Sequence, residues 1–242
     1  AGRVTGITLN DGTRIDAPVV VNVAGPHSFK INAMAEGVLE GCNIKTKALR
    51  HEVMHCPSPE DYDYLNDGFH TSDGDVGCYY RPEVGNTFLI GSEDPKCDPQ
   101  EWVDPDDFYA GKGGPGRDNH LSDAQWKAQC YRLAKRVPTL PVPNQPRGVV
   151  DLYDVSDDWI PIYDKSDLKG FYLAIGTSGN QYQNAPVVGA MMAELIDACE
   201  KGLDHDKAPF QFKMRYLGRN LDTGFFSRKR EINPDSSFSV NG

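Results

Sequence analysis

The chain contains 242 residues, 39% of them apolar and 25% charged, which is the composition of a globular protein with one or two domains. The net charge of -10 argues against a nucleic-acid surface, which is normally basic, and no apolar run is long enough to span a membrane. The six cysteines contain no Cys-x-x-Cys pair. We interpret them as reduced packing residues of a cytoplasmic protein, in preference to a disulfide framework or a zinc site.

The first part of the chain has the pattern of strands. It begins almost directly in such a pattern and without an initiator methionine, which suggests a fragment or a processed chain whose upstream part is missing. Asn10-Asp11-Gly12 predicts a hairpin turn between Val4–Leu9 and Thr13–Ile15. Val19–Val23 predicts a buried parallel strand. The Ala24-Gly25-Pro26 that ends it would let a ligand approach closely, unless Gly25 only makes a turn.

The middle of the chain mixes helical, extended and loop patterns. We expect a helix at Ser28–Leu39, a strand at Lys45–Cys56 and an acidic loop from Pro57 to Gly68. Val76–Arg81 and Thr87–Gly91 predict a hairpin. The stretch 93–116 is rich in Asp, Pro and Gly, which indicates a long surface loop, either a binding loop or only a mobile one.

The clearest helix begins after Ser122, which forms a capping box with Gln125 and is followed by one apolar face up to Pro138. Gly148–Val155 predicts another strand. The tail from Lys207 onward is polar, and its cations include Arg215, Arg219, Arg228, Lys229 and Arg230. Such a tail could dock on the same chain or on another subunit, but a solvated tail is the favoured interpretation.

The stretch around which the chain is organised is Phe171–Cys199, which predicts a buried strand, a glycine-rich loop at 176–181 and a helix. Pro186 suits a first helical turn, with Asn184 or Ala185 as the cap, and Gly202 a helix stop. The loop N–H groups and the helix N-terminus would converge on one spot that suits an anion or an electron-rich heterocycle. The glycines alone favour an ordinary strand-to-helix connection.

Taken in order, these motifs resemble the C-terminal part of the D-amino-acid-oxidase-like flavoprotein family, and within it the sarcosine and dimethylglycine oxidase/dehydrogenase branch. The matching segments are Gly12–Ala17 leading into Val19–Pro26, Tyr80-Arg81-Pro82 with Phe88–Gly91, Asp158 with Pro161-Ile162, and Gly176–Gly179 with Pro186 and Gly189. Members of the family open with a strand and a Gly-x-Gly-x-x-Gly phosphate loop, and this chain has no such opening.

The resemblance implies an α/β (α+β) fold in which a partial FAD-binding Rossmann-like domain, lacking its N-terminal half, accompanies a mixed-sheet substrate-binding domain. The implied divisions are 1–40 for a piece of the FAD-binding domain, 41–147 for the substrate-binding domain, 148–202 for the return to the FAD-binding domain, and 203–242 for the polar tail.

The resemblance also implies FAD and its contacts. On the cofactor side it implies Ala24, Gly25, Asp151, Gly176, Thr177, Ser178, Gly179, Asn180 and Gln181, and on the substrate side Tyr80, Tyr153, Tyr182 and Gln183. Three positions depart from the family. Asp151 stands where some members attach the flavin through a cysteine, so we expect non-covalent FAD. Gln183 stands near where oxidases carry a lysine, and Tyr153 where glycine-oxidase-like members hold the substrate with an arginine.

These features predict an enzyme that oxidises a C–N bond of a small amine or amino acid by hydride transfer to flavin, without a nucleic-acid or membrane partner and with homo-oligomerisation left open. The chain alone is expected to be inactive and to lack FAD. The alternative is a binding or assembly module without a redox role.

Overall fold

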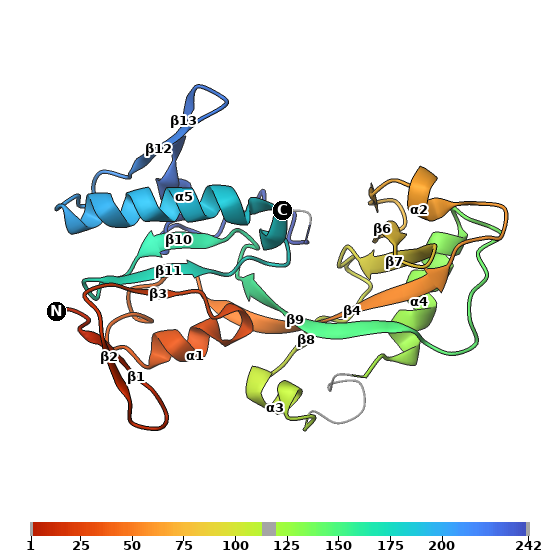
Figure 1. Ribbon diagram of the computed structural model, residues 1–242, viewed down its shortest axis with the longest axis horizontal. Helices are drawn as coiled ribbons and strands as arrows, with labels where there is room; N and C mark the ends of the chain where they lie inside the picture. Colours follow the sequence, from red (N-terminus) through yellow and green to blue (C-terminus); the bar gives the residue numbers. More distant parts are fainter. Residues whose placement is uncertain (1, 113–119, 241–242) are drawn as a thin grey trace. The chain divides into compact units, whose positions relative to one another are not determined.

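The computed structural model describes residues 2–112 and 120–240, and it has a mixed α/β fold made of two compact units (Figure 1). Unit 1 contains the chain up to Lys47 together with Asp154–Phe238, and unit 2 contains Ala48–Tyr153. The chain passes from one unit to the other within strand β4 (Thr46–Pro57) and returns within strand β9 (Gly148–Ser156).

Unit 1 is built on a three-stranded sheet with the order β10-β11-β3. Strand β11 (Phe171–Ile175) runs parallel to β3 (Val20–Asn22) and antiparallel to β10 (Ile162–Lys165). The predicted buried strand at 171–175 and its parallel neighbour are thus confirmed, although β3 is only three residues long. One apolar cluster packs β11 against the α1 region, and a second packs β10 and β11 against helix α5 (Gln181–Glu200).

The N-terminal hairpin, β1 (Gly6–Thr8) and β2 (Arg14–Asp16), forms as predicted around Gly12, whose φ of +86° favours glycine. The first helix is shorter than expected. A 3-10 turn, η1 (Gly25–His27), leads into α1 (Ser28–Ala33), which ends well before Leu39. Gly37 has a φ of +82°, which a continuing α-helix cannot contain.

Helix α5 begins earlier than the position of Pro186 suggested. Its N-cap is Asn180, not Asn184 or Ala185, and Pro186 lies inside the helix. The loop ends sooner because Ser178 and Gly179 both adopt positive φ values, +51° and +91°, so that the chain is already helical at Gln181. The expected stop is confirmed, since the helix ends at Glu200 and Gly202 has a φ of +105°.

Unit 2 contains a six-stranded sheet with the order β5-β6-β7-β4-β8, and β9 pairs with β4 as well. The strands not yet given are β5 (Thr71–Asp73), β6 (Cys78–Glu83), β7 (Thr87–Ser92) and β8 (Glu101–Trp102). The predicted hairpin at 76–91 is therefore confirmed as β6–β7. The two expected loops contain short helices, α2 (Tyr64–Asp67) and α3 (Pro105–Tyr109), and positions 113–116 of the second loop lie outside the described residues.

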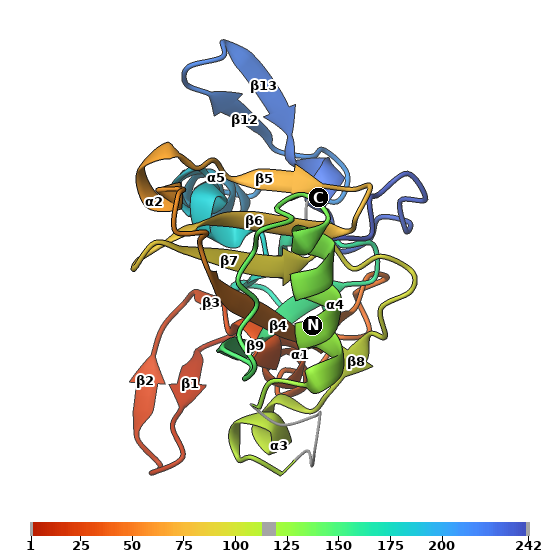
Figure 2. The same cartoon turned by 90° about the vertical axis from the view of Figure 1, so that its right-hand side faces the viewer.

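Helix α4 (Asp123–Ala134) lies against the sheet of unit 2 (Figure 2). Ser122 caps it as predicted, since its Oγ accepts a hydrogen bond from the Gln125 N–H at 3.2 Å. In a complete capping box the Gln125 side chain would accept a hydrogen bond from the Ser122 N–H. Here the Ser122 N–H donates instead to Glu52 Oε2 at 2.8 Å. The helix ends before Val137, so Pro138 is not its direct stop.

The tail is not the solvated segment that its composition favoured. It forms a hairpin, β12 (Gln211–Met214) and β13 (Arg219–Asp222), followed by the turn η2 (Thr223–Phe226). Arg228 is fully buried and its guanidinium binds Asp164, Asp167 and Asp206. The tail therefore docks on its own unit. All six cysteines are free thiols, and no helix in the described ranges is both long and apolar enough to cross a bilayer.

Candidate functional site

Strands β3 and β11 end at the same edge of the sheet of unit 1, because they run parallel with Asn22 opposite Leu173. The buried Asn22 side chain shapes the turn that follows β3: its Oδ1 accepts the Ala24 N–H at 3.0 Å and its Nδ2 donates to Ser28 O and Asn32 Oδ1. Gly25 has a φ of +55° and open space where a Cβ would lie. This edge is the usual ligand-binding edge of an α/β sheet.

The loop after β11 is fastened to the end of β9. The Gly176 N–H donates to Asp154 Oδ2 at 2.6 Å, and the Ser178 N–H donates to Asp154 O at 2.8 Å. Thr177 forms a β-bridge with Val155. Ser178 is fully buried, and its Oγ donates to Gly176 O at 3.2 Å. Asp154, which we had not assigned to the site, therefore sets the shape of this loop.

Gly176, which the resemblance implied on the cofactor side, has a structural role in its surroundings. A glycine that leaves room for a cofactor ring would have open space beside it. A Cβ at Gly176 would instead lie 3.0 Å from both Ser156 Cβ and Thr46 Cγ2, and the φ of +67° itself favours glycine. Because its N–H is also bonded to Asp154, Gly176 is a structural residue of the loop and offers no donor to a ligand.

The N-terminus of α5 presents unused polar groups at the same edge. Asn180 makes no side-chain cap, and its Oδ1 is a buried atom without a hydrogen-bond partner in the described part of the chain. The Tyr163 hydroxyl donates a hydrogen bond to Gln181 Oε1. Tyr182 is 96% exposed and Gln183 is exposed as well. The first-turn N–H groups and the helix dipole suit an anion or an electron-rich edge here.

The carboxyl group of Asp154 is the main titratable group beneath the loop. Burial raises the pKa of Asp154 to about 6, and the hydrogen bond from the Gly176 N–H limits the increase. The side chains of Thr46 and Ser28 also interact with this carboxyl group and limit the increase in its pKa further. The loop is thus supported by a carboxyl group that is partly protonated in mildly acidic solution.

In unit 2, the aromatic residues divide between the two faces of the sheet. The Tyr153 ring stacks on His51, with ring centroids 4.3 Å apart, and its hydroxyl interacts with that of Tyr79. The Tyr79 ring lies directly over Gly91, where a Cβ would fall 2.1 Å from its Cζ. Tyr80 packs instead against the core beside α4 and meets Phe88 edge-on at 6.2 Å. The neighbour of Tyr153 is therefore Tyr79, whereas Tyr80, which the resemblance implied on the substrate side, packs on the core.

A small polar cavity of about 30 Å³ lies beside β4, between the part of β4 that pairs with β8 and the part that pairs with β7. His51 Nε2, Asp94 Oδ2 and Gln129 Oε1 line this cavity and are buried atoms without partners in the described ranges. Burial lowers the pKa of His51 to about 4, so this imidazole is neutral at pH 7. Burial and the charge of Asp98 raise the pKa of Asp94 to about 7. No local sequence pattern predicts this cluster, because His51 lies in β4, Asp94 follows β7 and Gln129 lies in α4.

The remaining predicted residues are divided between the units. Ala24, Gly25 and 176–183 belong to unit 1, and Tyr80, Asp151 and Tyr153 belong to unit 2. Asp151 is exposed and accepts a hydrogen bond from the Tyr109 hydroxyl at 2.6 Å. In the part of the chain that the structure describes, no cluster of His, Cys, Asp and Glu could hold a metal ion.

Comparison with known protein families finds one matching family model, DAO, described as FAD dependent oxidoreductase, over residues 1–195. Among curated proteins, the mouse FAD-dependent oxidoreductase domain-containing protein 1 is 29% identical over 230 residues, covering 86% of this chain and 41% of the mouse protein. The bovine protein of the same name is 29% identical over 196 residues, covering 75% of this chain and 36% of its own length. The chain thus spans less than half the length of these relatives.

Solved structures of several enzymes share the fold. Fructosyl peptide oxidase from E. terrenum has a TM-score of 0.62 at 17% identity, covering 99% of this chain and 51% of that one. L-proline dehydrogenase from P. horikoshii has a TM-score of 0.60 at 22% identity, covering 80% and 46%. Glycine oxidase from Geobacillus kaustophilus has a TM-score of 0.59 at 17% identity, covering 92% and 48%. At these identities the likeness concerns the fold alone.

Proposed function

Since the chain belongs to the DAO family of FAD-dependent oxidoreductases, we propose that the protein carrying it oxidises a C–N bond of an amine or an amino acid. The observation that carries this proposal is the edge shared by β3 and β11, where the open turn at Gly25 and the uncapped N-terminus of α5 come together. The structural neighbours include a glycine oxidase and an L-proline dehydrogenase, whose names indicate substrates with C–N bonds.

The residues at this edge fit the flavin of FAD. Gly25 leaves its surface open, the first turn of α5 has free N–H donors, and the buried Asn180 Oδ1 lacks a partner. An electron-rich heterocycle with both donor and acceptor atoms along one edge would satisfy these groups. Thr177, Gly179, Asn180 and Gln181 are accordingly our candidates for holding it, together with Ala24 and Gly25.

When bound, FAD supplies the hydride acceptor of the oxidation. The chain itself supplies orientation and electrostatics. The N-terminus of α5 carries a partial positive charge that stabilises negative charge developing beside it, and the rigid loop fixed by Asp154 needs no rearrangement to provide it. We infer that FAD is held without a covalent bond in this region, because Asp151 has neither the thiol nor the imidazole that attachment requires.

The substrate class is proposed on the resemblance to the sarcosine and dimethylglycine branch. Tyr153 and Tyr79 are our candidates for contacts with the substrate, because their hydroxyls meet on the sheet face where His51 supports the Tyr153 ring. Tyr182 and Gln183 remain candidates on the exposed first turn of α5. Gln183 carries no positive charge to favour superoxide formation, so we propose a dehydrogenase that prefers an acceptor other than oxygen.

A spectroscopic experiment on the full-length protein tests the proposal. We expect flavin absorbance that is released completely by acid precipitation and bleached anaerobically by sarcosine, dimethylglycine, glycine or L-proline. Stopped-flow reoxidation should be slow in air and faster with an artificial acceptor, and Gln183→Lys should speed the reaction with oxygen. A protein without flavin would support the binding or assembly module instead. Flavin that no amine reduces would contradict the substrate class.

Two glycine variants test whether this edge holds the cofactor. Gly25→Ala and Gly12→Ala both place a Cβ at a positive φ in open space within unit 1. Both should lower the Tm slightly, because alanine is strained in this conformation. Only Gly25→Ala should weaken FAD binding, by roughly 10-fold if a close contact is lost. Equal FAD affinity in the two variants would remove Gly25 from the site.

A further inference from the structure

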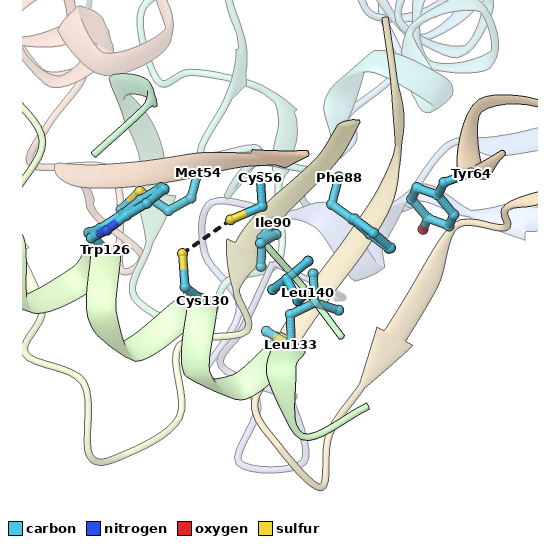
Figure 3. Packing of buried hydrophobic residues seen from close by; sticks show 10 residues of the cluster. Met54, Cys56, Tyr64, Phe88, Ile90, Trp126, Cys130, Leu133 and Leu140 are labelled. Carbon is cyan, nitrogen blue, oxygen red and sulfur yellow. Dashed lines mark hydrogen bonds between the residues drawn. The ribbon is translucent and has the colours of Figure 1, made fainter. Parts of the chain in front are cut away.

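Two buried thiols face each other in unit 2. Cys56, near the end of β4, and Cys130, in α4, have Sγ atoms 3.3 Å apart although 74 positions separate them in the sequence. Both side chains are fully buried. Figure 3 shows the two sulfurs pointing toward each other across the interface between strand and helix. We propose that Cys56 and Cys130 are a redox-active pair that closes into a disulfide bond.

The geometry favours this pair over every other combination of cysteines. A disulfide bond has an S–S length of about 2.05 Å, so the two sulfurs need to approach by only about 1.2 Å, which side-chain rotation with a small shift of α4 can supply. The thiol of Cys42 is engaged differently, since it donates to Val38 O at 3.1 Å. In the described part of the chain, no other two cysteine sulfurs are in contact.

The contact couples the ionisation of the two thiols. A hydrogen bond between the sulfurs stabilises a thiolate on one of them, and either sulfur can be the donor. Because the thiolate is the nucleophile in thiol–disulfide exchange, one cysteine of the pair attacks and the other resolves the intermediate.

The reaction requires an oxidant, which we assign to the class of small disulfides, RSSR. The thiolate of one cysteine attacks one sulfur of RSSR, forms a mixed disulfide and releases RS⁻. The other cysteine then loses its proton, attacks the protein sulfur of the mixed disulfide and releases the second RS⁻. The two protein thiols lose two electrons and two protons in total, and RSSR becomes two RSH.

The surroundings of the pair set the rate and the effect of this reaction. Met54, Trp126 and Leu133 pack around the sulfurs and exclude solvent, so that RSSR can reach the pair only when α4 moves away from the sheet. Exchange in the folded protein is therefore slow. The bond would close a loop that contains β5 to β8, and such a closure restricts the unfolded chain strongly.

The test uses the full-length protein carrying this chain, in a Cys97→Ser background that removes an exposed thiol. It is equilibrated with oxidised and reduced glutathione at several ratios, alkylated in denaturant and mapped by non-reducing peptide mass spectrometry. We expect a Cys56–Cys130 peptide at oxidising ratios and the loss of two alkylatable thiols. The Tm of the transition that includes unit 2 should rise by roughly 5–15 °C and return on reduction with dithiothreitol.

Two variants serve as controls. Cys130→Ser should abolish the crosslink, whereas Cys42→Ser, which removes a buried thiol outside the pair, should leave it intact. If the Cys130→Ser variant does not fold, the peptide mapping of the Cys97→Ser protein tests the proposal without it. Full alkylation of Cys56 and Cys130 at every glutathione ratio would overturn the proposal, as would a bond from either residue to a different cysteine.

Discussion

Gly176 has a left-handed backbone conformation and no space for a side chain. A larger residue at this position should therefore destabilise the fold. Gly176→Val would strain the backbone at φ +67° and press a branched side chain against Ser156 and Thr46, which lie 3.0 Å from an added Cβ. We expect the free energy of unfolding of the apo-protein to fall by roughly 2–4 kcal/mol. Thermal unfolding of the flavin-free protein measures this loss.

Gly12→Val is the matched control for this variant. Gly12 has a φ of +86° but open space around an added Cβ, so its variant carries the backbone strain without the overpacking. The difference in Tm between the two variants therefore reports the contacts with Ser156 and Thr46. If Gly176→Val kept the Tm of the control and lost only FAD affinity, Gly176 would be a cofactor contact after all.

Asp154 makes stability depend on pH in an unusual direction for a carboxyl group. Its pKa is about 6 in the fold, above the ordinary value of about 3.9, so the folded protein binds the proton more tightly than the unfolded chain does. The contribution to stability is greatest below about pH 4, decreases between about pH 4 and 6, and is constant above. Through Asp154, the free energy of unfolding is therefore larger in acidic solution than at neutral pH.

Asp154→Asn should remove this decrease, because the amide oxygen can still accept the Gly176 N–H while no charge forms. Urea unfolding from pH 4 to 7 should give a wild-type-minus-variant difference that changes by roughly 2 kcal/mol. The same substitution at the exposed Asp16 serves as the reference for effects of charge alone. A difference that does not vary with pH would show that Asp154 does not titrate in this range.

At the scale of elements, periodicity and turn residues predicted the strands and helices where local signals decide them. The hairpin at Gly12, the strand before Gly176 and the cap at Ser122 are of this kind. The start of α5 is not, because it depends on Ser178, a non-glycine residue in a left-handed conformation that Asp154 holds in place. Pro186 favours the first turn of a helix only statistically. The hydrogen bond between Ser178 and Asp154 fixes an earlier start.

The site residues show the same division between local and long-range signals. Because side chains alternate along β6, Tyr79 and Tyr80 lie on opposite faces of the sheet. The sequence alone does not predict which of the two shares a face with Tyr153. His51 and Asp94 meet at the cavity only because β7 and β8 leave a gap along β4. Their shifted pKa values therefore arise from tertiary structure, which no local pattern contains.

Buried ion pairs hold the C-terminal segment, and the guanidinium of Arg228 is the most deeply buried of the cations. Arg228 Nη1 donates to Asp164 Oδ2 and to Asp206 Oδ1, both at 2.9 Å, and Asp164 is itself fully buried. Arg228→Met would leave the Asp164 carboxylate buried without its guanidinium. We expect a loss of roughly 3–5 kcal/mol in the stability of unit 1, since breaking one side of a buried ion pair leaves a charge uncompensated.

Limited proteolysis and urea unfolding measure this effect. Arg215→Met, in the same segment but exposed, is the matched control and should change stability by less than about 0.5 kcal/mol. Arg228→Met combined with Asp164→Asn should recover part of the loss, because no buried charge then remains unpaired. An Arg228→Met protein as stable and as resistant to protease as the control would show that other contacts hold the segment, such as the ion pair between Arg230 and Asp158.

At the scale of the whole molecule, the chain covers 41% of its mouse relative, and the described sheet of unit 1 has three strands. Strand β3 is at the edge of the three-stranded sheet, and in the described residues no strand pairs with its other side. Val23 at the end of β3 is 68% exposed. The Gly-x-Gly-x-x-Gly match at 111–116 begins after helix α3 instead of after a strand, and most of it lies outside the described residues.

These features predict how the isolated chain differs from the full-length protein. The pyrophosphate of FAD is normally bound by backbone N–H groups of a strand–loop–helix phosphate site, and in the described residues no Gly-x-Gly-x-x-Gly follows a strand. Several charge-assisted hydrogen bonds would be lacking, so we expect the isolated chain to bind FAD on the order of 100-fold more weakly or worse. The exposed edge of β3 should also promote self-association. Fluorescence titration with FAD and sedimentation velocity, each on both proteins, measure the two effects. Stoichiometric FAD in a monomeric isolated chain would show that this half of the site suffices.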